Sequence, residues 1–376
     1  MPTIRRSLGG DAKTMDIDIK RLLQLMVQND ISDIHFKADS CPVYRLHGSL
    51  VTATAYPKAT PEDLAGMADQ LMNEEQKKRF AAEQEADMAY NIEGVSRFRV
   101  NVCMQRGSIC LTLRVIPAKL RTFEELNLPV KSLENLSDYS RGIILFAGIT
   151  GAGKTTTMNS YLGYLNERYD YRVVTVEDPI EYYHEDIKCS IIQREVGRDT
   201  KSFAAALKHI LRQDPDIIVI GEMRDLETMQ AALNAAETGH LVLSTVHTMD
   251  AARTLDRIVD AHPPHQQAQV RQQLSGALKG IVAQRLVSTV SGQVRYPATE
   301  VLIGNSLIRT QIQEGKTEDI LKAMEGGAFY GMHTFDQDLF RLCQEGKISE
   351  KVALENSTSP QDLTLKIRGL SSTTGI

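Results

Sequence analysis

The sequence predicts an α/β protein in which a smaller N-terminal α+β domain precedes a larger α/β domain with a phosphate-binding loop and a helical C-terminal region. Three observations lead to this prediction. In the first third of the chain, helical segments are mixed with strands whose pattern alternates with period two. From Arg141 onward, continuous apolar strands alternate with helices, which is typical of a parallel sheet covered on both faces. A glycine-rich loop follows the first of these apolar strands.

The composition is that of an ordinary globular protein, with 42% hydrophobic and 24% charged residues in a chain of 376. The net charge of -5 argues against a large phosphate-binding surface, so we expect no nucleic-acid partner. The five cysteines are scattered without a CxxC pair, so we expect no structural zinc and a reducing, cytoplasmic location. No apolar run approaches the roughly 20 residues that a membrane span requires.

The N-terminal elements are read from spacing and from turn and cap residues. Thr60 and Pro61 predict the N-cap and first position of a helix, and Arg106 with Gly107 supplies the turn of a hairpin. The expected elements are a helix at 17–30, strands at 32–38 and 42–48, helices at 61–72 and 73–84, and hairpin strands at 96–107 and 108–117.

A break in the pattern at 117–129 predicts a linker, and the apolar strands of the second domain follow it. These strands are expected at 142–148, 171–177, 216–222 and 240–246. After about Ser306 the pattern is helical. The boundaries that follow are a tail at 1–15, a first domain at 16–121, a linker at 122–128, an α/β core at 129–305, a helical region at 306–370 and a tail at 371–376.

The loop from Gly148 to Thr155 matches the GxxxxGK[ST] pattern and lies between a predicted strand and a predicted helix, as that motif requires. Glycines let backbone N–H groups surround a phosphate, and the helix N-terminus adds partial positive charge. Lys154 is expected to reach the β- and γ-phosphates of ATP, and the Thr155 hydroxyl to bind Mg²⁺. The predicted nucleotide-binding residues are Thr150, Gly151, Ala152, Gly153, Lys154, Thr155 and Thr156.

Two carboxylates end apolar strands, where acidic partners of such a loop are found in parallel sheets. Glu177 closes the strand at 171–177 and Glu222 closes the strand at 216–222. One of them is expected to orient the attacking water and the other to bind Mg²⁺ directly or through water. Spacing leaves open which glutamate has which role, and a strand-end carboxylate can also be a surface cap.

Histidines bracket a third apolar strand. His247 is expected at the same sheet edge as the two glutamates, where it would sense the γ-phosphate by hydrogen bonding. His240 lies at the other end of that strand, roughly 23 Å away if the strand is extended, so the pair is not expected to bind one metal ion. Either histidine can instead be a strand-end residue without a ligand.

Arginines gather on one face of the predicted hairpin. Arg97 and Arg99 share a face with Asn101, and Arg114 lies on the partner strand. They are either solvated surface residues or arginine fingers that reach a γ-phosphate held by another domain.

Six segments in this order carry a family resemblance: GITGAGKTTT, VEDPIEYYH, SIIQREVGRDTKSF, LRQDPDIIVIGEMRD, AAETGHLVLSTVHT and DRIVDAHP. Together they resemble the secretion and type IV pilus ATPases, and most closely the pilus retraction motors of the PilT/PilU kind. The resemblance extends from about Met15 to Leu370. It implies a PAS-like N-terminal domain and a RecA-like ATPase domain, assembled as a homohexameric ring that binds ATP between the domains.

The resemblance also implies roles and partners. Glu177 would be the general base, Glu222 would belong to an atypical Walker B motif, and His240 would fall in the family's His box, with His247 just beyond it. Arg97, Arg99 and Arg114 match the region that supplies arginine fingers. The implied partners are an inner-membrane pilus platform protein and a second retraction ATPase, and the implied location is peripheral, at the inner-membrane base of the pilus machine.

Several alternatives stay open. The absence of a four-cysteine zinc module and the short N-terminal region favour retraction over extension or secretion. The segment 306–316 keeps only Ile308, Arg309, Ile312 and Glu314 of a motif often present in retraction motors, which leaves an accessory, PilU-like role open. Other classes are a scaffold that binds ATP without hydrolysing it, a nucleic-acid translocase and a GTPase. The retained glutamates argue against the scaffold, and the acidic net charge argues against the translocase. The absence of an NKxD-type motif argues against the GTPase.

Overall fold

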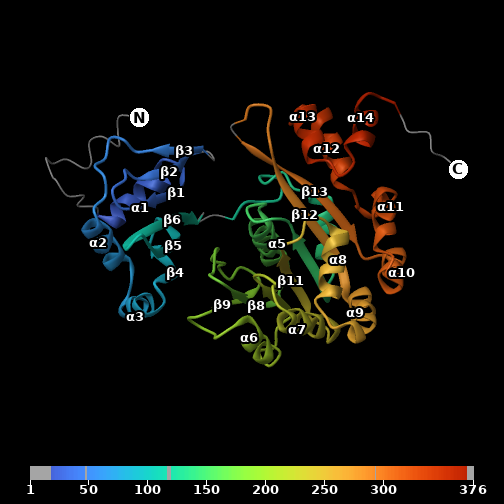
Figure 1. Ribbon diagram of the computed structural model, residues 1–376. Helices are drawn as coiled ribbons and strands as arrows, with labels where there is room; N and C mark the ends of the chain where they lie inside the picture. Colours follow the sequence, from blue (N-terminus) through green and yellow to red (C-terminus); the bar gives the residue numbers. More distant parts are fainter. Residues whose placement is uncertain (1–17, 47–48, 117–119, 293, 371–376) are drawn as a thin grey trace. The chain divides into compact units, whose positions relative to one another are not determined.

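The computed structural model describes residues 18–46, 49–116, 120–292 and 294–370 (Figure 1). The predicted tails at 1–15 and 371–376 lie outside the described residues. Contacts divide the chain into two compact units, Met1–Lys119 and Leu120–Ile376. We call them the N-terminal unit and the C-terminal unit and describe each by itself.

The N-terminal unit is a six-stranded antiparallel sheet with strand order β3-β2-β1-β6-β5-β4. Helices α1 and α2 pack on β6, and α1 also packs on β1. The strands are β1 (Ile31–Phe36), β2 (Val43–Leu46), β3 (Ser49–Thr52), β4 (Glu85–Ile92), β5 (Ser96–Gln105) and β6 (Ser108–Ile116). The helices are α1 (Ile19–Gln28), α2 (Pro61–Leu71) and α3 (Glu74–Glu83).

Local signals account for most of these elements. Thr60 caps α2 with Pro61 at its first position, as predicted, and Asp63 completes a capping box. The β5–β6 hairpin turns at Arg106 and Gly107, which have φ values of 51° and 78°, the backbone conformation that such a two-residue turn requires. Strands β3 and β4 were not predicted. The four residues of β3 show no alternation of apolar and polar residues, whereas β4 does alternate, with Ala86 and Met88 buried between exposed neighbours, and this signal was missed.

The C-terminal unit is built on a seven-stranded sheet with strand order β13-β12-β7-β11-β10-β8-β9. Every residue of β7, β10 and β11 is buried, so both faces of the central sheet are covered. The strands are β7 (Gly142–Ala147), β8 (Arg172–Glu177), β9 (Ser190–Glu195), β10 (Ile217–Ile220), β11 (Leu241–Val246), β12 (Leu278–Ser288) and β13 (Arg295–Ile303).

The sheet is mixed rather than purely parallel, which corrects the sequence-based expectation. Strands β7 to β12 pair in parallel, but β13 pairs with β12 in the antiparallel direction. The chain reverses from β12 into β13 through a short connection, which permits only antiparallel pairing.

Helices alternate with these strands and then follow one another after Ser306, as predicted. The helices between strands are α4 (Val130–Ser137), α5 (Lys154–Arg168), α6 (Phe203–Ile210), α7 (Leu226–Glu237), α8 (Ala251–Asp260) and α9 (Pro264–Ala277). The terminal helices are α10 (Ser306–Glu314), α11 (Ile320–Glu325), α12 (Phe335–Gln344), α13 (Glu350–Asn356) and α14 (Pro360–Ile367). Helices α5 and α7 both pack against β7 and β11.

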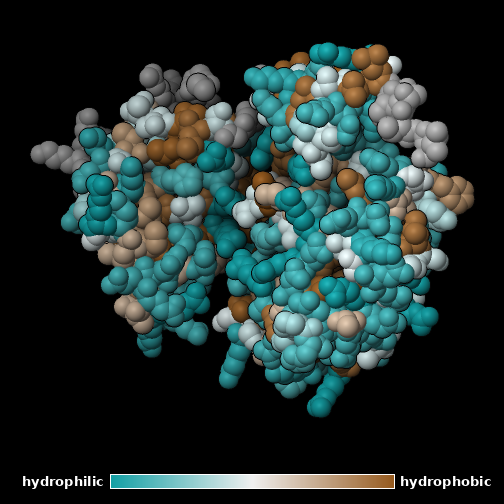
Figure 2. Space-filling view, turned by 45° about the vertical axis from the view of Figure 1, so that its right-hand side comes forward, coloured by the Kyte–Doolittle hydropathy of each residue, from teal (hydrophilic) through white to brown (hydrophobic). Residues whose placement is uncertain are grey.

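The surface in view is mostly hydrophilic, with apolar side chains in small groups (Figure 2). In the part of the chain that the structure describes, no helix combines the length and the apolar character that crossing a bilayer demands.

Candidate active site

The glycine-rich loop joins β7 to α5 and has the backbone that a phosphate cradle needs. Gly148, Gly151 and Gly153 have φ values of 151°, 77° and 90°. A Cβ atom at Gly148 would lie 2.6 Å from the carbonyl oxygen of Gln284, and one at Gly153 would lie 2.8 Å from the Gln284 Nε2 atom. Gly148 is therefore required both by its conformation and by the backbone of β12, whereas Gly153 is required mainly by its positive φ, because the end of the Gln284 side chain can shift.

Lys154 is the first residue of α5, and only 6% of it is exposed. Its Nζ donates a hydrogen bond of 3.0 Å to the carbonyl oxygen of Ile149 within the loop. Burial lowers the pKa of Lys154, while the nearby carboxylates of Glu222 and Glu181 oppose that shift. An ammonium held here is poorly solvated, so phosphate oxygens would be strongly favoured partners.

Glu222, His247 and Thr150 form a polar group beside the loop. Glu222 lies just beyond β10, and His247 follows the neighbouring strand β11. The Nε2 atom of His247 lies 3.4 Å from Glu222 Oε2, and its Nδ1 atom lies 3.5 Å from Thr150 Oγ1. Arg224 pairs with the other Glu222 oxygen, with 2.7 Å between Nε and Oε1. Burial and the charge of Lys154 lower the pKa of His247, so a neutral imidazole donates to Glu222.

Glu177 is the last residue of β8 and is 4% exposed. Gly221 makes room for it, because a Cβ at Gly221 would lie 3.3 Å from Glu177 Cα. Thr175 Oγ1 donates to Glu177 Oε1 at 2.7 Å, and Gln193 Nε2 donates to the same oxygen at 3.1 Å. Burial raises the pKa of Glu177, and the hydrogen bonds from Thr175 and Gln193 partly offset that rise.

The residues of the C-terminal unit fit a phosphate group with a divalent cation. A Cβ at Gly148 would collide with the β12 backbone that supports the loop, Lys154 is buried there, and Thr155 and Glu222 offer the oxygen ligands that Mg²⁺ prefers. Among the described residues, no group of three or more His, Cys, Asp or Glu side chains is placed to bind a metal ion by itself. The cation would therefore be held mainly by phosphate oxygens, Thr155 and Glu222.

The structure does not bring His240 to this group. It precedes β11, and His247 follows the same strand, so the two are separated by about 23 Å along an extended backbone. The Nδ1 atom of His240 lies 3.0 Å from the carbonyl oxygen of Ala235 and 3.2 Å from Thr238 Oγ1, at the end of α7. Within one chain its contacts are those of a helix-end residue, and its catalytic role stays a prediction from the resemblance.

The three candidate finger arginines lie in the N-terminal unit. Arg99 and Arg114 are directly opposite each other on β5 and β6. Arg114 Nε lies 2.6 Å from Oδ1 of the buried Asp33, whereas Arg99 Nε lies 3.8 Å from Asp87 Oδ1 and its side chain is 37% exposed. Arg97 is only 5% exposed, contrary to the open polar face that the alternation of β5 predicts.

Sequence reasoning missed three residues that contact the site, two of them on other strands. Gln193 on β9 contacts Glu177, Gln284 on β12 accepts a hydrogen bond of 2.7 Å from Thr157 beneath the loop, and Arg224 pairs with Glu222. For Gln284 the available signal was a polar residue after the apolar run Ile281–Ala283 of β12. Such a signal indicates that a residue is unusual but does not identify its contacts. Gln193 gave no such signal, because most residues of β9 are polar.

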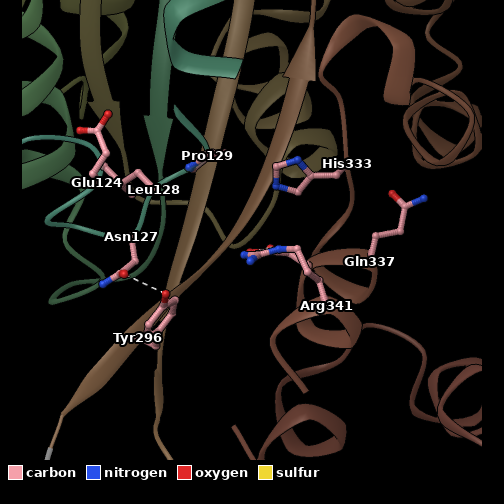
Figure 3. Close-up of a pocket in the computed structure, with 9 residues that line it drawn as sticks. Glu124, Asn127, Leu128, Pro129, Tyr296, His333, Gln337 and Arg341 are labelled. Atoms are coloured by element: carbon pink, nitrogen blue, oxygen red, sulfur yellow. Dashed lines mark hydrogen bonds and ion pairs between the residues drawn. The ribbon is translucent and has the colours of Figure 1, made fainter. Parts of the chain in front are cut away.

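A separate pocket of about 470 Å³ lies in the C-terminal unit (Figure 3). Glu124 and Asn127 approach it from the segment predicted as a linker, and His333 and Arg341 lie on the other side. Tyr296 donates a hydrogen bond of 2.8 Å to Asn127 Oδ1 and so ties this segment to β13. None of the predicted nucleotide-site residues lines this pocket.

Comparison of the sequence and the structure with known proteins identifies the family of this chain. Residues 10–353 match the family described as type II/IV secretion system protein. The chain is 41% identical to the type IV pilus retraction ATPase PilT of Pseudomonas aeruginosa, over 92% of this chain and all of that protein. It is 40% identical to the type IV pilus ATPase PilU of the same organism, over 94% of this chain and 92% of PilU. A crystal structure of the pilus retraction motor PilT with bound ADP has 42% identity and a TM-score of 0.84, over 93% of this chain and 99% of that one.

Proposed function

Because this chain belongs to the type II/IV secretion system protein family, we propose that it is an ATP-hydrolysing motor that drives retraction of type IV pili. The observation that carries the proposal is a buried Lys154 with the Glu222 carboxylate nearby, and Glu177 beside Gly221 at the end of the strand next to β10, in a chain that aligns with PilT along the whole length of PilT. Without the two glutamates, the phosphate loop would bind a nucleotide but would lack a group to activate water.

ATP would bind with its phosphates in the glycine loop. Backbone N–H groups between Thr150 and Thr156 and the ammonium of Lys154 would neutralise the β- and γ-phosphates. When bound, Mg²⁺ would supply further charge neutralisation of the phosphate oxygens, held by the Thr155 hydroxyl and by Glu222. The buried setting strengthens these interactions relative to water.

Glu177 is assigned as the general base. A water molecule would attack the γ-phosphorus, forming a new P–O bond while the bond to the bridging oxygen of ADP breaks, and its proton would pass to the Glu177 carboxylate. The raised pKa of Glu177 brings this group closer to the value that suits a base near neutral pH. Glu222 is less suited to this task, because Arg224 and His247 already contact its two oxygens.

The N-terminal unit would convert ATP hydrolysis into movement of one domain against the other. We assign residues 16–121 to a PAS-like domain, 122–128 to a linker and 129–305 to a RecA-like core. Contacts divide the chain after Lys119, close to the end of the first of these domains, but they group 122–128 with the C-terminal unit, where Phe123 and Leu128 are buried. Arg97, Arg99 or Arg114 would reach the γ-phosphate of a bound nucleotide, which would bias the linked domains toward a closed state. In a homohexamer at the inner-membrane base of the pilus, sequential closure would turn a platform protein and withdraw pilin subunits.

The substitution Lys154→Ala tests the enzymatic part of this proposal. Phosphate release by the purified protein should fall by at least about 100-fold, because the charge that stabilises the transferring phosphoryl group is lost. Lys366→Ala, on the terminal helix α14, is the matched control and should leave the rate unchanged. ATP hydrolysis at the parental rate by Lys154→Ala would rule out the assigned loop.

Deletion of the gene tests the direction of force. A retraction motor predicts surface pili in excess and loss of twitching, whereas loss of surface pili would indicate an extension motor.

A second candidate is an accessory motor that acts with another retraction ATPase. Identity to PilU is 40% and identity to PilT is 41%, so identity does not separate the two roles. The accessory role is favoured by segment 306–316, which keeps only part of the retraction motif and contains α10. Purified protein that hydrolyses ATP, combined with pili that still retract in the deletion strain, would favour the accessory role.

A further inference from the structure

A chain of hydrogen bonds connects Glu177 with the start of α5, and the proposed mechanism does not use it. It runs from Glu177 through Gln193 on β9 to His184, then through Asn159 to the backbone of Thr155. These residues come from β8, β9, α5 and the loop after β8. The chain therefore joins the proposed base to the proposed magnesium ligand by a route other than the nucleotide.

The register of the sheet places Gln193 at the base. Strands β8 and β9 pair in parallel with Thr175 opposite Gln193. Both side chains donate to the same Glu177 oxygen, at 2.7 Å from Thr175 Oγ1 and 3.1 Å from Gln193 Nε2. Two donors that converge on one oxygen restrict rotation of the carboxylate group.

The surroundings of Gln193 determine which end of its amide faces Glu177. The backbone N–H of His184 donates to Gln193 Oε1 at 2.9 Å, and Gln193 Nε2 also donates to the Tyr182 carbonyl oxygen at 2.7 Å. The amide oxygen therefore has a donor partner and the amide nitrogen has two acceptors. If the Gln193 amide were flipped, its NH₂ group would face the backbone N–H of His184, and two donors would oppose each other. The Nε2 donor of Gln193 is therefore held toward Glu177.

His184 anchors the same loop to α5. Its Nε2 atom lies 2.7 Å from Asn159 Oδ1, an acceptor, and Asn159 Nδ2 donates to the Thr155 carbonyl oxygen at 2.9 Å. Burial lowers the pKa of His184 to about 4, and in the described part of the chain its Nδ1 has no hydrogen-bond partner. The imidazole is thus neutral and carries its proton on Nε2.

We propose that Gln193 is a positioning residue that orients the Glu177 carboxylate for proton transfer from the attacking water. It would act through Glu177 rather than on the nucleotide or the water directly. The proposal rests on the assignment of Glu177 as the general base. The hydrogen bonds of His184 and Asn159 to α5 would keep the loop that orients Gln193 in a constant position relative to the phosphate cradle.

The test compares Gln193→Met with the parent in steady-state ATP hydrolysis from pH 5.5 to 9. Loss of the donor should lower kcat about 10-fold or more, leave KM for ATP within about threefold, and move the acidic limb of kcat to higher pH. Gln193→Glu keeps the shape but sets a second acid against Glu177, so it should move that limb further. Gln272→Met, an exposed glutamine on α9, is the matched control.

Glu177→Gln and the double variant Glu177→Gln with Gln193→Met separate the possible outcomes. If Gln193 acts through Glu177, the second substitution should not lower the residual rate of Glu177→Gln further. Parental hydrolysis by Glu177→Gln would instead remove the base assignment itself. Inactive Glu177→Gln together with a Gln193→Met enzyme of unchanged kcat and pH profile would overturn only the present inference.

Folding is checked independently of activity. Affinity for ADP and the melting temperature should remain close to the parental values in Gln193→Met and in Gln193→Glu. If Gln193→Met does not fold, Gln193→Glu is used for the same comparison, and an unchanged acidic limb in that variant also overturns the proposal.

Discussion

At Glu177, burial and hydrogen bonding act on the same carboxylate in opposite directions. Burial raises its pKa, whereas donors from Thr175 and Gln193 stabilise the charged form. The balance matters because a general base must be deprotonated before water attacks. A raised pKa means that activity is lost on acidification at a higher pH than for an ordinary glutamate.

Thr175→Val should shift that balance in a measurable way. Valine keeps the shape of threonine but removes the hydroxyl donor, so the charged form of Glu177 loses a partner and its pKa rises further. The acidic limb of kcat should move upward by several tenths of a pH unit or more. Thr364→Val on the exposed face of α14 is the control, and an unmoved limb in Thr175→Val would argue against Glu177 as the base.

At the scale of elements, the glycine loop is held against β12. Gly148→Ala adds a Cβ that would lie 2.6 Å from the Gln284 carbonyl oxygen, at a φ of 151° that alanine rarely adopts. We expect a loss of about 1–3 kcal/mol in stability and a clear loss of nucleotide affinity, because the loop must move. Gly276→Ala, in α9 with no atom within 4 Å of its added Cβ, should be neutral or slightly stabilising.

Melting temperatures and ADP titrations of the two variants provide the measurement. Equal affinity for ADP in Gly148→Ala and the parent would show that the close approach of β12 is not needed for the cradle.

Glu300 on β13 joins the starts of two helices. Its oxygens accept hydrogen bonds from the N–H groups of Ala251 at 2.8 Å and Phe335 at 3.4 Å, the first residues of α8 and α12. Burial raises its pKa from 4.5 to about 7, with Asp250 adding to the rise. The pKa of Glu300 is higher in the folded protein than in the unfolded chain. The protonated carboxyl group therefore contributes its full stabilisation of the fold below about pH 4.5, and this contribution is lost as the pH rises through about 7.

Glu300→Gln removes this titration. The stability of the parent relative to the variant should therefore decline by about 1–3 kcal/mol between pH 4.5 and pH 8. Thermal melting of both proteins across this range gives the difference directly. A difference that stays constant with pH would show that Glu300 does not titrate in this window.

At the scale of the whole molecule, the arginines of one unit are proposed to serve the phosphate chemistry of the other. Arg99→Ala and Arg114→Ala should each be tested, because the resemblance does not distinguish them. The expected result for the true finger is a fall in turnover of about 100-fold or more with ADP affinity largely kept. Normal turnover in both variants would leave only Arg97 as a candidate.

Stability distinguishes the two substitutions. Arg114→Ala should also destabilise the N-terminal unit by about 1–3 kcal/mol, because the buried Asp33 loses its 2.6 Å partner. Arg99→Ala should have little such effect, since Asp87 is half-exposed and 3.8 Å away. Arg79→Ala on α3, which removes an exposed pair with Glu83, is the control for both measurements.

The sequence by itself determined the parts that depend on neighbouring residues. The phosphate loop is recognisable because its strand, glycines and helix are contiguous, and the apolar runs at β7, β8, β10 and β11 identify a covered sheet. The ends of these strands located Glu177, Glu222 and His247 correctly, since carboxyl ends of parallel strands share one edge.

The tertiary structure decided what depends on strand pairing. Gln193 meets Glu177 only because β9 pairs with β8 in one register, and Gln284 lies under the loop only because β12 borders β7. The antiparallel β13 and the unpredicted β3 likewise follow from which strand lies beside which. Pairing between segments distant in sequence is set by packing of the whole core, which a local pattern does not encode.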